Sequence, residues 1–411
     1  MPLVVDFSAV KEPVRYALVG ATGIGGYHLA AIREMEKNGL VRLAAVADPA
    51  LARLPDLRAE LTAQGASCHL DYRELLRQEP GLDAVVLSVP IPFHFEITLA
   101  CLERDLFIYL EKPPVPLIQQ LESMIAADKR RRIGVGFQMI TANWVQTLKR
   151  AIVDGKLGQV QDIRIGACWP RLDHYYGRNN SAGKMFVQGE PVFDGPATNA
   201  LAHLIHNAMF LAGAGADEFD APVEITAELY RARPIESYDV ACLRGKFRSG
   251  ITFTAALTHA TEEMLPFQME VRGSGGWGRV TQDGAVFESS FPGESPRPDT
   301  FEQLVEKTHR QFLAAVRGEQ PRFSTSLADS RGYVLATNGM LLSSGGIHSI
   351  AAGHLRQYTR GDERGYDAAG LHAAVITSFE TGKLFSELDL PWAVKTAPVS
   401  VEGLKSLSLP F

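Results

Sequence analysis

A lysine stands at the end of one apolar segment, where its charge has an unusual setting. Lys112 follows the run LFIYLE and precedes two prolines. Burial disfavours an ammonium group, so a lysine in such a place can titrate close to neutral pH and act as a general acid or base. The alternative is an ordinary surface lysine at a strand end, and the residue by itself does not exclude that alternative.

A glycine-rich turn offers a second chemistry, the binding of phosphate groups. Gly20, Gly23 and Gly25 lie in VGATGIGGYH, between a strand pattern and a helix pattern. In the fingerprint G-x-G-x-x-G such glycines permit a tight turn, and the amides at the helix start face a pyrophosphate. Thr22 replaces the middle glycine, so either room at Gly23 or the Thr22 hydroxyl must accommodate the phosphates. A plain strand-to-helix turn is the alternative.

An aspartate ends the next apolar segment, VRLAAVAD. Asp48 follows Gly20 by 28 residues, and Arg53 is the nearest basic residue after it. An acidic side chain at this point accepts hydrogen bonds from the ribose hydroxyls of NAD and repels the 2′-phosphate of NADP. The sequence therefore predicts NAD in preference to NADP, with a surface aspartate as the alternative.

The elements around these residues change in character along the chain. Up to about residue 140, near-continuous apolar strands alternate with helix patterns, which predicts an α/β domain with a doubly wound parallel Rossmann sheet. Beyond it, hairpin-like turns join looser strands, which predicts an α+β domain with a large, mostly antiparallel open sheet. We expect a cofactor domain at 1–140, a substrate and oligomerisation domain at 141–345, and an extension at 346–411 packing on both.

A polar and aromatic loop, WPRLDHYYGRNN, precedes the helix pattern ATNALAHLIHNAMFLAGAG in the second domain. Flat rings and hydrogen-bonding heads are what a carbohydrate site needs. A solvated loop or a subunit contact is an equal alternative. The candidate substrate residues in this loop are Arg171, Asp173, Tyr175, Arg178 and Asn179.

Four motifs taken together resemble one family of dehydrogenases. V-G-x-x-x-x-G-x-x-H, the aspartate ending the second strand, V-P-x-P-x-x-H and E-K-P-P are similar to the Gfo/Idh/MocA family of glucose–fructose oxidoreductase, inositol dehydrogenase and rhizopine-catabolism enzymes. The resemblance implies that Lys112 lies at the nicotinamide and the substrate hydroxyl, and that the Lys112–Pro113 bond is cis. The implied cofactor contacts are Gly20, Thr22, Gly23, Ile24, Gly25, Asp48, Ser88, Pro90, His94, Glu111 and Lys112.

The family's second signature, D-x-G-x-H, is altered here to N-A-L-A-H, with Asn199 in place of Asp and His203 retained. The resemblance implies that Asn199 and His203 contact the substrate, and on a helix residues four apart share a face. An asparagine holds no negative charge, so Lys112 is expected to carry more of the acid–base work. His206 offers a second polar contact or is a satisfied helix histidine. No third ligand accompanies these two histidines, so no metal is expected.

These features predict an NAD-dependent dehydrogenase that oxidises a secondary hydroxyl of a sugar, sugar derivative or cyclitol, with Lys112 and His203 as its catalytic residues. The alternatives are an NAD-dependent glycosidase using transient oxidation and elimination, and a non-enzymatic dinucleotide sensor. A net charge of −6 without a basic block excludes nucleic acid as the expected partner, and no apolar run is long enough for a membrane span. Four scattered cysteines indicate a cytoplasmic protein. The resemblance implies a homo-oligomer, either a dimer or a tetramer.

Overall fold

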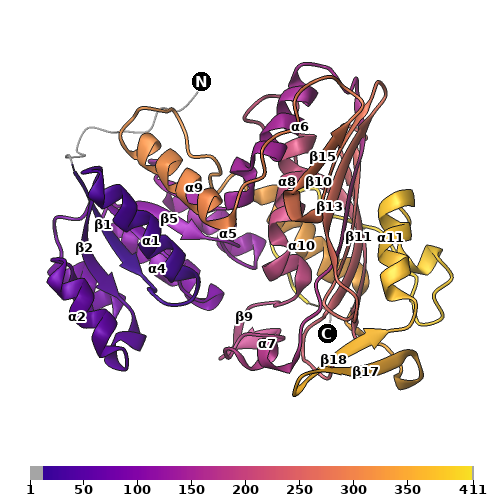
Figure 1. The fold of residues 1–411 in the computed structure, drawn as a ribbon, viewed down its shortest axis with the longest axis horizontal. Coiled ribbons are helices and arrows are strands. Elements are labelled where there is room, and N and C mark those ends of the chain that lie inside the picture. The colour runs from indigo at the N-terminus through magenta and orange to yellow at the C-terminus, as the bar shows by residue number, and fades with distance from the viewer. Residues whose placement is uncertain (1–12, 410–411) are drawn as a thin grey trace. The chain divides into compact units, whose positions relative to one another are not determined.

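The computed structural model describes residues 13–409, which form two compact units. The first unit comprises Met1–Val115, Gln120–Thr141 and Thr300–Ser330, and the remaining segments form the second unit (Figure 1). Among the residues that the structure describes, no helix has the length and apolar character needed to cross a lipid bilayer.

The first unit is built on a six-stranded sheet with the order β3-β2-β1-β4-β5-β6. Every strand pair in it is parallel, which confirms the predicted doubly wound sheet. Its strands are β1 (Val14–Val19), β2 (Val41–Ala47), β3 (Ser67–His69), β4 (Ala84–Leu87), β5 (Phe107–Glu111) and β6 (Ile133–Gly136). Its helices are α1 (Ile24–Lys37), α2 (Pro55–Ala63), α3 (Tyr72–Gln78), α4 (His94–Glu103), α5 (Ile118–Ala127) and α9 (Phe301–Val316), with short turns η1 (Pro49–Ala52), η2 (Ile91–Phe93) and η3 (Gln138–Thr141).

The neighbouring strands β1 and β4 mark the point at which the strand order reverses. Val19 pairs with Leu87, so the loops that follow these two strands leave the sheet side by side. Ligands of doubly wound sheets bind at this kind of switch point, beyond the carboxyl ends of the strands. The sheet therefore brings the glycine turn and the Ser88 loop together, although they are far apart in the sequence.

Helix α9 belongs to the first unit, which corrects the predicted domain boundaries. The sequence placed residues 300–330 within the second domain, as part of one continuous stretch. In the structure the Phe312 ring lies 6.2 Å from that of Tyr16 and 5.6 Å from that of Tyr109, both in edge contact. Its apolar face therefore completes the core against strands β1 and β5.

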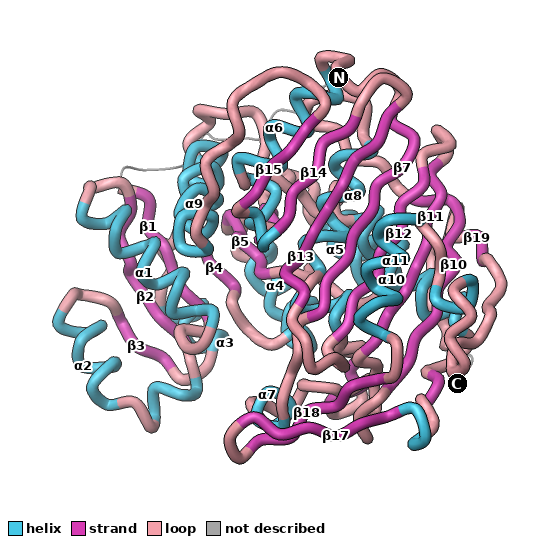
Figure 2. The backbone as a smooth tube through the Cα atoms, turned by 45° about the vertical axis from the view of Figure 1, so that its right-hand side comes forward, coloured by secondary structure: helices cyan, strands magenta, loops and turns pink. Residues whose placement is uncertain are grey.

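The second unit is built on a nine-stranded sheet with the order β15-β14-β13-β7-β12-β11-β10-β16, and β19 also pairs with β10. Only the β7–β12 and β10–β16 pairs are parallel, so the predicted mostly antiparallel sheet is confirmed (Figure 2). Its strands are β7 (Val160–Cys168), β10 (Pro222–Arg231), β11 (Val240–Phe247), β12 (Thr252–Thr258), β13 (Leu265–Gly273), β14 (Trp277–Thr281), β15 (Val286–Ser289), β16 (His348–Ser349) and β19 (Val399–Ser400). Two small hairpins pair β8 (Phe186–Val187) with β9 (Glu190–Pro191), and β17 (Leu355–Arg360) with β18 (Glu363–Ala368).

Helices cover both faces of this second sheet. Figure 1 shows α8 and α10 on one side and α11 on the other. Helix α11 packs on β7 and β12 and buries Leu371 and Val375 in a core with Cys168, Cys242 and Ala256. The C-terminal extension therefore covers part of the face that the sequence predicted to be open. The helices of this unit are α6 (Asn143–Val153), α7 (Asp173–Gly177), α8 (Ala202–Ala212), α10 (Arg331–Ser344) and α11 (Leu371–Thr381), with short turns η4 (Pro196–Ala200), η5 (Gln282–Gly284), η6 (Ala352–His354) and η7 (Phe385–Glu387).

Candidate functional site

Two glycines of the turn after β1 are required by close backbone approach. A Cβ atom on Gly20 would lie 2.1 Å from the main-chain oxygen of Ser88, and the φ angle of Gly20 is +86°. A Cβ atom on Gly25 would lie 2.1 Å from the main-chain oxygen of Gly20. Both positions therefore exclude a side chain, as expected for the first and last glycines of a dinucleotide fingerprint.

The Thr22 side chain is directed to Asp48 in the structure. Its hydroxyl lies 3.2 Å from Asp48 Oδ2, which also accepts from the Ala21 amide at 2.8 Å. The other carboxylate oxygen accepts from the Ala50 amide at 2.8 Å. Gly23 adopts φ +60° and nothing lies within 4 Å of its Cβ position, so space remains beside the turn. Asp48 already accepts three hydrogen bonds, and a carboxylate has about four acceptor positions, which leaves one for a ribose hydroxyl.

The start of α1 fits a dinucleotide phosphate group. Gly23 is the N-cap, with no capping side chain, and the first turn contains no acidic residue. The first amides of a helix lack partners within the helix and attract anions. Beside them, Ser88 Oγ is buried, and no described residue is its hydrogen-bond partner. A cradle closed to side chains, uncapped amides and a buried hydroxyl are what a bound dinucleotide would use.

Glu111 is the last residue of β5, Lys112 follows it, and the Lys112–Pro113 bond is cis, as predicted. Glu111 is buried, accepts from the Lys112 amide at 3.1 Å, and accepts from the side-chain amide of Gln138. Burial alone would raise the pKa of Glu111, but the hydrogen bond and charge of His28, with the charge of Lys112, lower it below its usual value. The lysine therefore stands beside a buried carboxylate that stays ionised.

Two histidines, His28 and His309, extend a chain of polar contacts from Glu111 into the core of the first unit. His28 Nε2 lies 3.1 Å from Glu111 Oε1, and His28 Nδ1 lies 2.9 Å from His309 Nε2. His309 comes from α9 and stacks on Tyr109 with ring centroids 4.6 Å apart. An ionised carboxylate only accepts, so His28 donates to Glu111 through Nε2. Burial and the His28 charge lower the pKa of His309 well below its usual value. Sequence reasoning missed His309, because only the fold brings α9 beside α1.

His94 joins the two loops around the lysine. Its Nδ1 lies 2.9 Å from the Pro113 oxygen and its Nε2 lies 2.8 Å from the Val89 oxygen. Burial lowers its pKa, although the contacts with the Val89 and Pro113 oxygens act in the opposite direction. His94 thus links the Ser88–His94 loop, which includes the exposed Pro90, to the segment after Lys112. This placement supports a structural role close to the cofactor site.

The candidate substrate loop of the second unit has divided roles. The Asp173 carboxylate is held by Arg233 and by Arg364 Nε, the latter at 3.0 Å. Burial alone would raise the pKa of Asp173, but the hydrogen bonds and charges of these two guanidinium groups lower it. Asn179 Oδ1 accepts from the amides of residues 181 and 182, so it caps a turn. Asp173 and Asn179 therefore shape the loop, while Arg171, Tyr175 and Arg178 form a separate cluster described below.

The predicted continuous helix through N-A-L-A-H is wrong at its start. Asn199 lies in a π-helical turn, Pro196–Ala200, and α8 begins only at Ala202. The Asn199 amide donates to Asp194 Oδ1 at 2.7 Å, and Asp194 Oδ2 accepts from the Gly183 amide at the same distance. Asp194 is buried, and the sequence analysis did not select it. The Asp-Gly-Pro run that contains it was the available signal, because such a run breaks a helix.

His203 and His206 both lie on α8 but have different surroundings. His203 is 9% exposed, whereas His206 is fully buried between the rings of Phe219 and Tyr333. Burial lowers the pKa of His206 to about 3. His206 is therefore a neutral core residue and not a second polar substrate contact. Among the residues that the structure describes, no three His, Cys, Asp or Glu side chains form a metal site.

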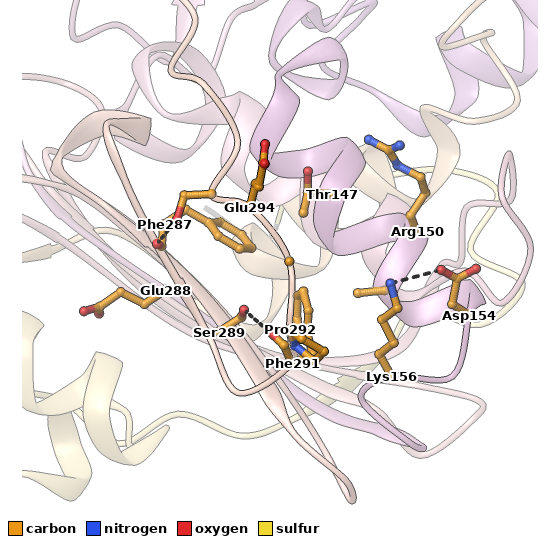
Figure 3. Close-up of a pocket in the computed structure, with 13 residues that line it drawn as sticks. Thr147, Arg150, Asp154, Lys156, Phe287, Glu288, Ser289, Phe291, Pro292 and Glu294 are labelled. Atoms are coloured by element: carbon orange, nitrogen blue, oxygen red, sulfur yellow. Dashed lines mark hydrogen bonds and ion pairs between the residues drawn. The ribbon is translucent and has the colours of Figure 1, made fainter.

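A groove in the second unit contains none of the predicted site residues. It has a volume of about 620 Å³ and lies between α6 and β15 with the loop that follows β15 (Figure 3). Its charged side chains have both signs, and Lys156 pairs with Asp154 at 3.4 Å. Such a lining does not select for either charge, so the candidate site is assigned from the residues above and not from this groove.

Comparison with known proteins supports the cofactor domain. Residues 14–137 match the family described as "Oxidoreductase family, NAD-binding Rossmann fold", and residues 145–279 match the "GFO/IDH/MocA C-terminal domain". Inositol 2-dehydrogenase 4 of Saccharopolyspora erythraea is 31% identical over 188 residues, covering 45% of this chain and 51% of that protein. Inositol 2-dehydrogenase of Streptomyces avermitilis is 30% identical over 200 residues, covering 48% and 52%. The chain thus spans about half the length of these curated relatives.

A solved structure has the same fold over most of its length. The WlbA dehydrogenase of Bordetella pertussis, in complex with NADH and UDP-GlcNAcA, aligns with a TM-score of 0.69 at 20% identity, covering 82% of this chain and 96% of that one. At this identity the likeness establishes the fold. Together with the matched family description, it identifies the first unit as an NAD-binding Rossmann domain.

Proposed function

The chain belongs to the Gfo/Idh/MocA family of oxidoreductases, and we propose that it is an NAD-dependent dehydrogenase that oxidises a secondary hydroxyl of a sugar, sugar derivative or cyclitol. One observation supports this most strongly. A lysine follows directly on a buried, ionised carboxylate, in the same unit as the cofactor turn. A carboxylate beside a lysine stabilises its ammonium form, which favours transfer of a hydroxyl proton to that lysine.

In this proposal, NAD held at the glycine turn would supply the hydride acceptor for the substrate carbon. Lys112 Nζ takes the hydroxyl proton, and the negative charge of Glu111 stabilises the resulting ammonium group. His28 and Gln138 hold Glu111 in place by hydrogen bonds, so that charge stays fixed beside the lysine. His203 and Asn199 orient the other hydroxyls of the substrate, and Asp194 fixes the Asn199 amide.

The cofactor contacts are proposed along the same lines. The amides of Thr22, Gly23 and Ile24 face the phosphates, Ser88 Oγ offers a hydrogen bond, and Asp48 offers its remaining acceptor position to a ribose hydroxyl. Because Asp48 also disfavours a 2′-phosphate, we propose NAD over NADP. We further propose that the protein is a cytoplasmic homo-oligomer.

The test is a Lys112→Ala variant assayed with NAD and a panel of polyols and sugars, and Lys37→Ala is the matched control. The Lys37 side chain is 75% exposed on α1, so its removal should leave kcat unchanged. Lys112→Ala should lower kcat by at least ~100-fold and retain NAD binding. Near-normal turnover would refute the role of Lys112. Release of aglycone from aryl glycosides without NADH accumulation would instead indicate a glycosidase that recycles its cofactor.

A further inference from the structure

Five side chains of the second unit form one contiguous group, here called the Arg171 cluster: Trp169, Arg171, Tyr175, Arg178 and His259. The Arg171 guanidinium lies 5.5 Å from the ring centroid of Trp169 and 4.7 Å from that of Tyr175. The Arg178 guanidinium lies 3.5 Å from the Tyr175 ring, and the Tyr175 and His259 rings are 5.7 Å apart. Main-chain bonds fix the group, since the Arg171 amide donates to the His259 oxygen at 3.2 Å.

Three polar atoms of this cluster are buried, and no described residue is their hydrogen-bond partner. They are Trp169 Nε1, Arg171 Nε and His259 Nε2. A buried polar group without a partner is costly, so native proteins rarely leave three of them in one place. His259 is itself only 3% exposed. An accumulation of this kind indicates that a ligand supplies the missing partners.

Two of the three atoms need a hydrogen-bond acceptor, and the third needs a donor. Trp169 Nε1 and Arg171 Nε both carry hydrogen and need an acceptor. His259 Nδ1 lies 2.8 Å from the Trp169 oxygen, which only accepts, so the proton of the neutral ring is on Nδ1. Burial, with the charges of Arg171 and Arg178, lowers the pKa of His259 to about 3, which keeps the ring neutral. Its Nε2 is therefore an acceptor that needs a donor, such as a hydroxyl.

Arg171 and Arg178 bring two positive charges to the Tyr175 ring, and Asp194 is a carboxylate whose negative charge also acts on Tyr175. Asp173 is held by Arg233 and Arg364. Asp194, whose charge acts on Tyr175, accepts from the Asn199 amide and the Gly183 amide. The Arg178 side chain donates to the main-chain oxygen of Tyr175 at 2.6 Å. Two guanidinium groups around one tyrosine thus favour an anionic ligand.

We propose that the Arg171 cluster binds a carboxylate of the substrate together with a neighbouring hydroxyl. The carboxylate accepts from Trp169 and Arg171, and Arg178 adds its charge. The hydroxyl donates to His259 Nε2. This inference rests on the proposed function, since it narrows the polyhydroxy substrate to a sugar acid such as a hexuronate. It assigns binding roles only, and the carbon that is oxidised is elsewhere on the substrate.

The experiment measures binding directly, so that it does not depend on turnover. The NAD-loaded protein is titrated by calorimetry with glucuronate, galacturonate, their neutral parent sugars and glucose 6-phosphate. The variants are Arg171→Gln, which keeps a polar side chain, and His259→Phe, which removes the acceptor. Arg150→Gln is the matched control, because Arg150 is an exposed arginine on α6 outside the cluster.

At least one hexuronate should bind at least tenfold more tightly than its neutral parent. Arg171→Gln should weaken that binding by ~10- to 100-fold and leave neutral sugars unchanged, as expected for a lost charge-assisted contact. His259→Phe should weaken it by a smaller factor, and Arg150→Gln should have no effect. Equal binding of acids and parent sugars, or an equal loss for both in Arg171→Gln, would overturn the proposal. Arg171-dependent binding of the phosphate alone would overturn the carboxylate assignment.

Failure of this inference is distinguishable from failure of the proposed function. Hexuronates that bind through Arg171 but yield no NADH would uphold the carboxylate site and refute the dehydrogenase. Neutral polyols that are oxidised, with no hexuronate bound, would uphold the dehydrogenase and refute the carboxylate site.

Discussion

Acidification should destabilise the second unit, because two of its histidines are buried and neutral. Burial lowers the pKa of His206 and of His259 to about 3, whereas an unfolded histidine titrates near pH 6.5. As the pH falls below about 6.5, the unfolded chain binds protons that the native unit does not bind. The free energy of unfolding therefore falls in the window between about pH 6.5 and pH 3.

The magnitude follows from one proton per histidine. Between pH 7.5 and pH 5.5, an unfolded histidine with a pKa of 6.5 gains proton-binding free energy of about 1.4 kcal/mol, and the buried ring gains almost none. Asp239 acts in the opposite direction, since burial raises its pKa to about 6 and the native unit binds a proton there. Asp239 contributes equally to the free energy of unfolding of the wild type and of a variant that lacks one histidine, so its contribution cancels when the two proteins are compared.

The assay is urea unfolding followed by tryptophan fluorescence. All four tryptophans belong to the second unit, at positions 144, 169, 277 and 392, so the signal reports on that unit. When the pH is lowered from 7.5 to 5.5, the free energy of unfolding of His206→Gln should fall by about 1.4 kcal/mol less than that of the wild type. Asn207→Ala is the control, because it also alters a buried polar side chain on α8 but removes no titratable group. Equal losses in the wild type and His206→Gln would refute the argument that burial keeps this ring neutral.

Three substitutions test the two turns of the candidate site. Gly20→Ala should lower the free energy of unfolding by several kcal/mol, measured by thermal unfolding, and weaken NAD binding at least ~10-fold. Gly39→Ala is the control, because Gly39 has φ +70° but lies in open space; it should cost about 1–2 kcal/mol and leave NAD binding unchanged. Thr22→Val should change the calorimetric Kd for NAD less than about threefold, because its hydroxyl is already used within the protein, and a larger loss would place that hydroxyl on a phosphate. Asn199→Asp should be less stable at pH 8 than at pH 5 relative to wild type, since a second carboxylate would face Asp194 at hydrogen-bonding distance, and an unchanged pH profile would contradict that contact.

The first unit was largely predictable because its signals are local. Each strand of a parallel sheet is buried on both faces, so apolar runs such as LDAVVLSVP and LFIYLE are recognisable as strands. The glycine turn is recognisable because it lies between a strand pattern and a helix pattern. The order of those strands in a doubly wound sheet then places the glycine turn beside Ser88. The amphipathic pattern of α9 predicted a helix but not its partner, because periodicity states that a face is apolar and not which core it covers.

Contacts between distant residues were beyond the reach of the sequence. His28 and His309 are 281 residues apart, and no spacing rule relates them. The same holds for Asp173, which as a loop residue looked available for a hydroxyl until Arg233 and Arg364 were seen to hold it. The sequence shows that a polar loop contains a charged side chain, but only the structure shows whether other side chains already pair with that charge or leave it for a ligand.

The altered signature at Asn199 gains a physical explanation from its partner. The exchange of the family aspartate for asparagine suggested that this turn had lost its carboxylate. In the structure the carboxylate of Asp194 lies 2.7 Å from the Asn199 amide nitrogen, so a negative charge is retained five residues upstream. An amide that donates to a fixed carboxylate has its own oxygen oriented as well, because the two ends of the group are rigidly joined. Under the proposed function, this turn recognises a hydroxyl of the substrate through an oriented amide, and the proton transfer is the role proposed for Lys112.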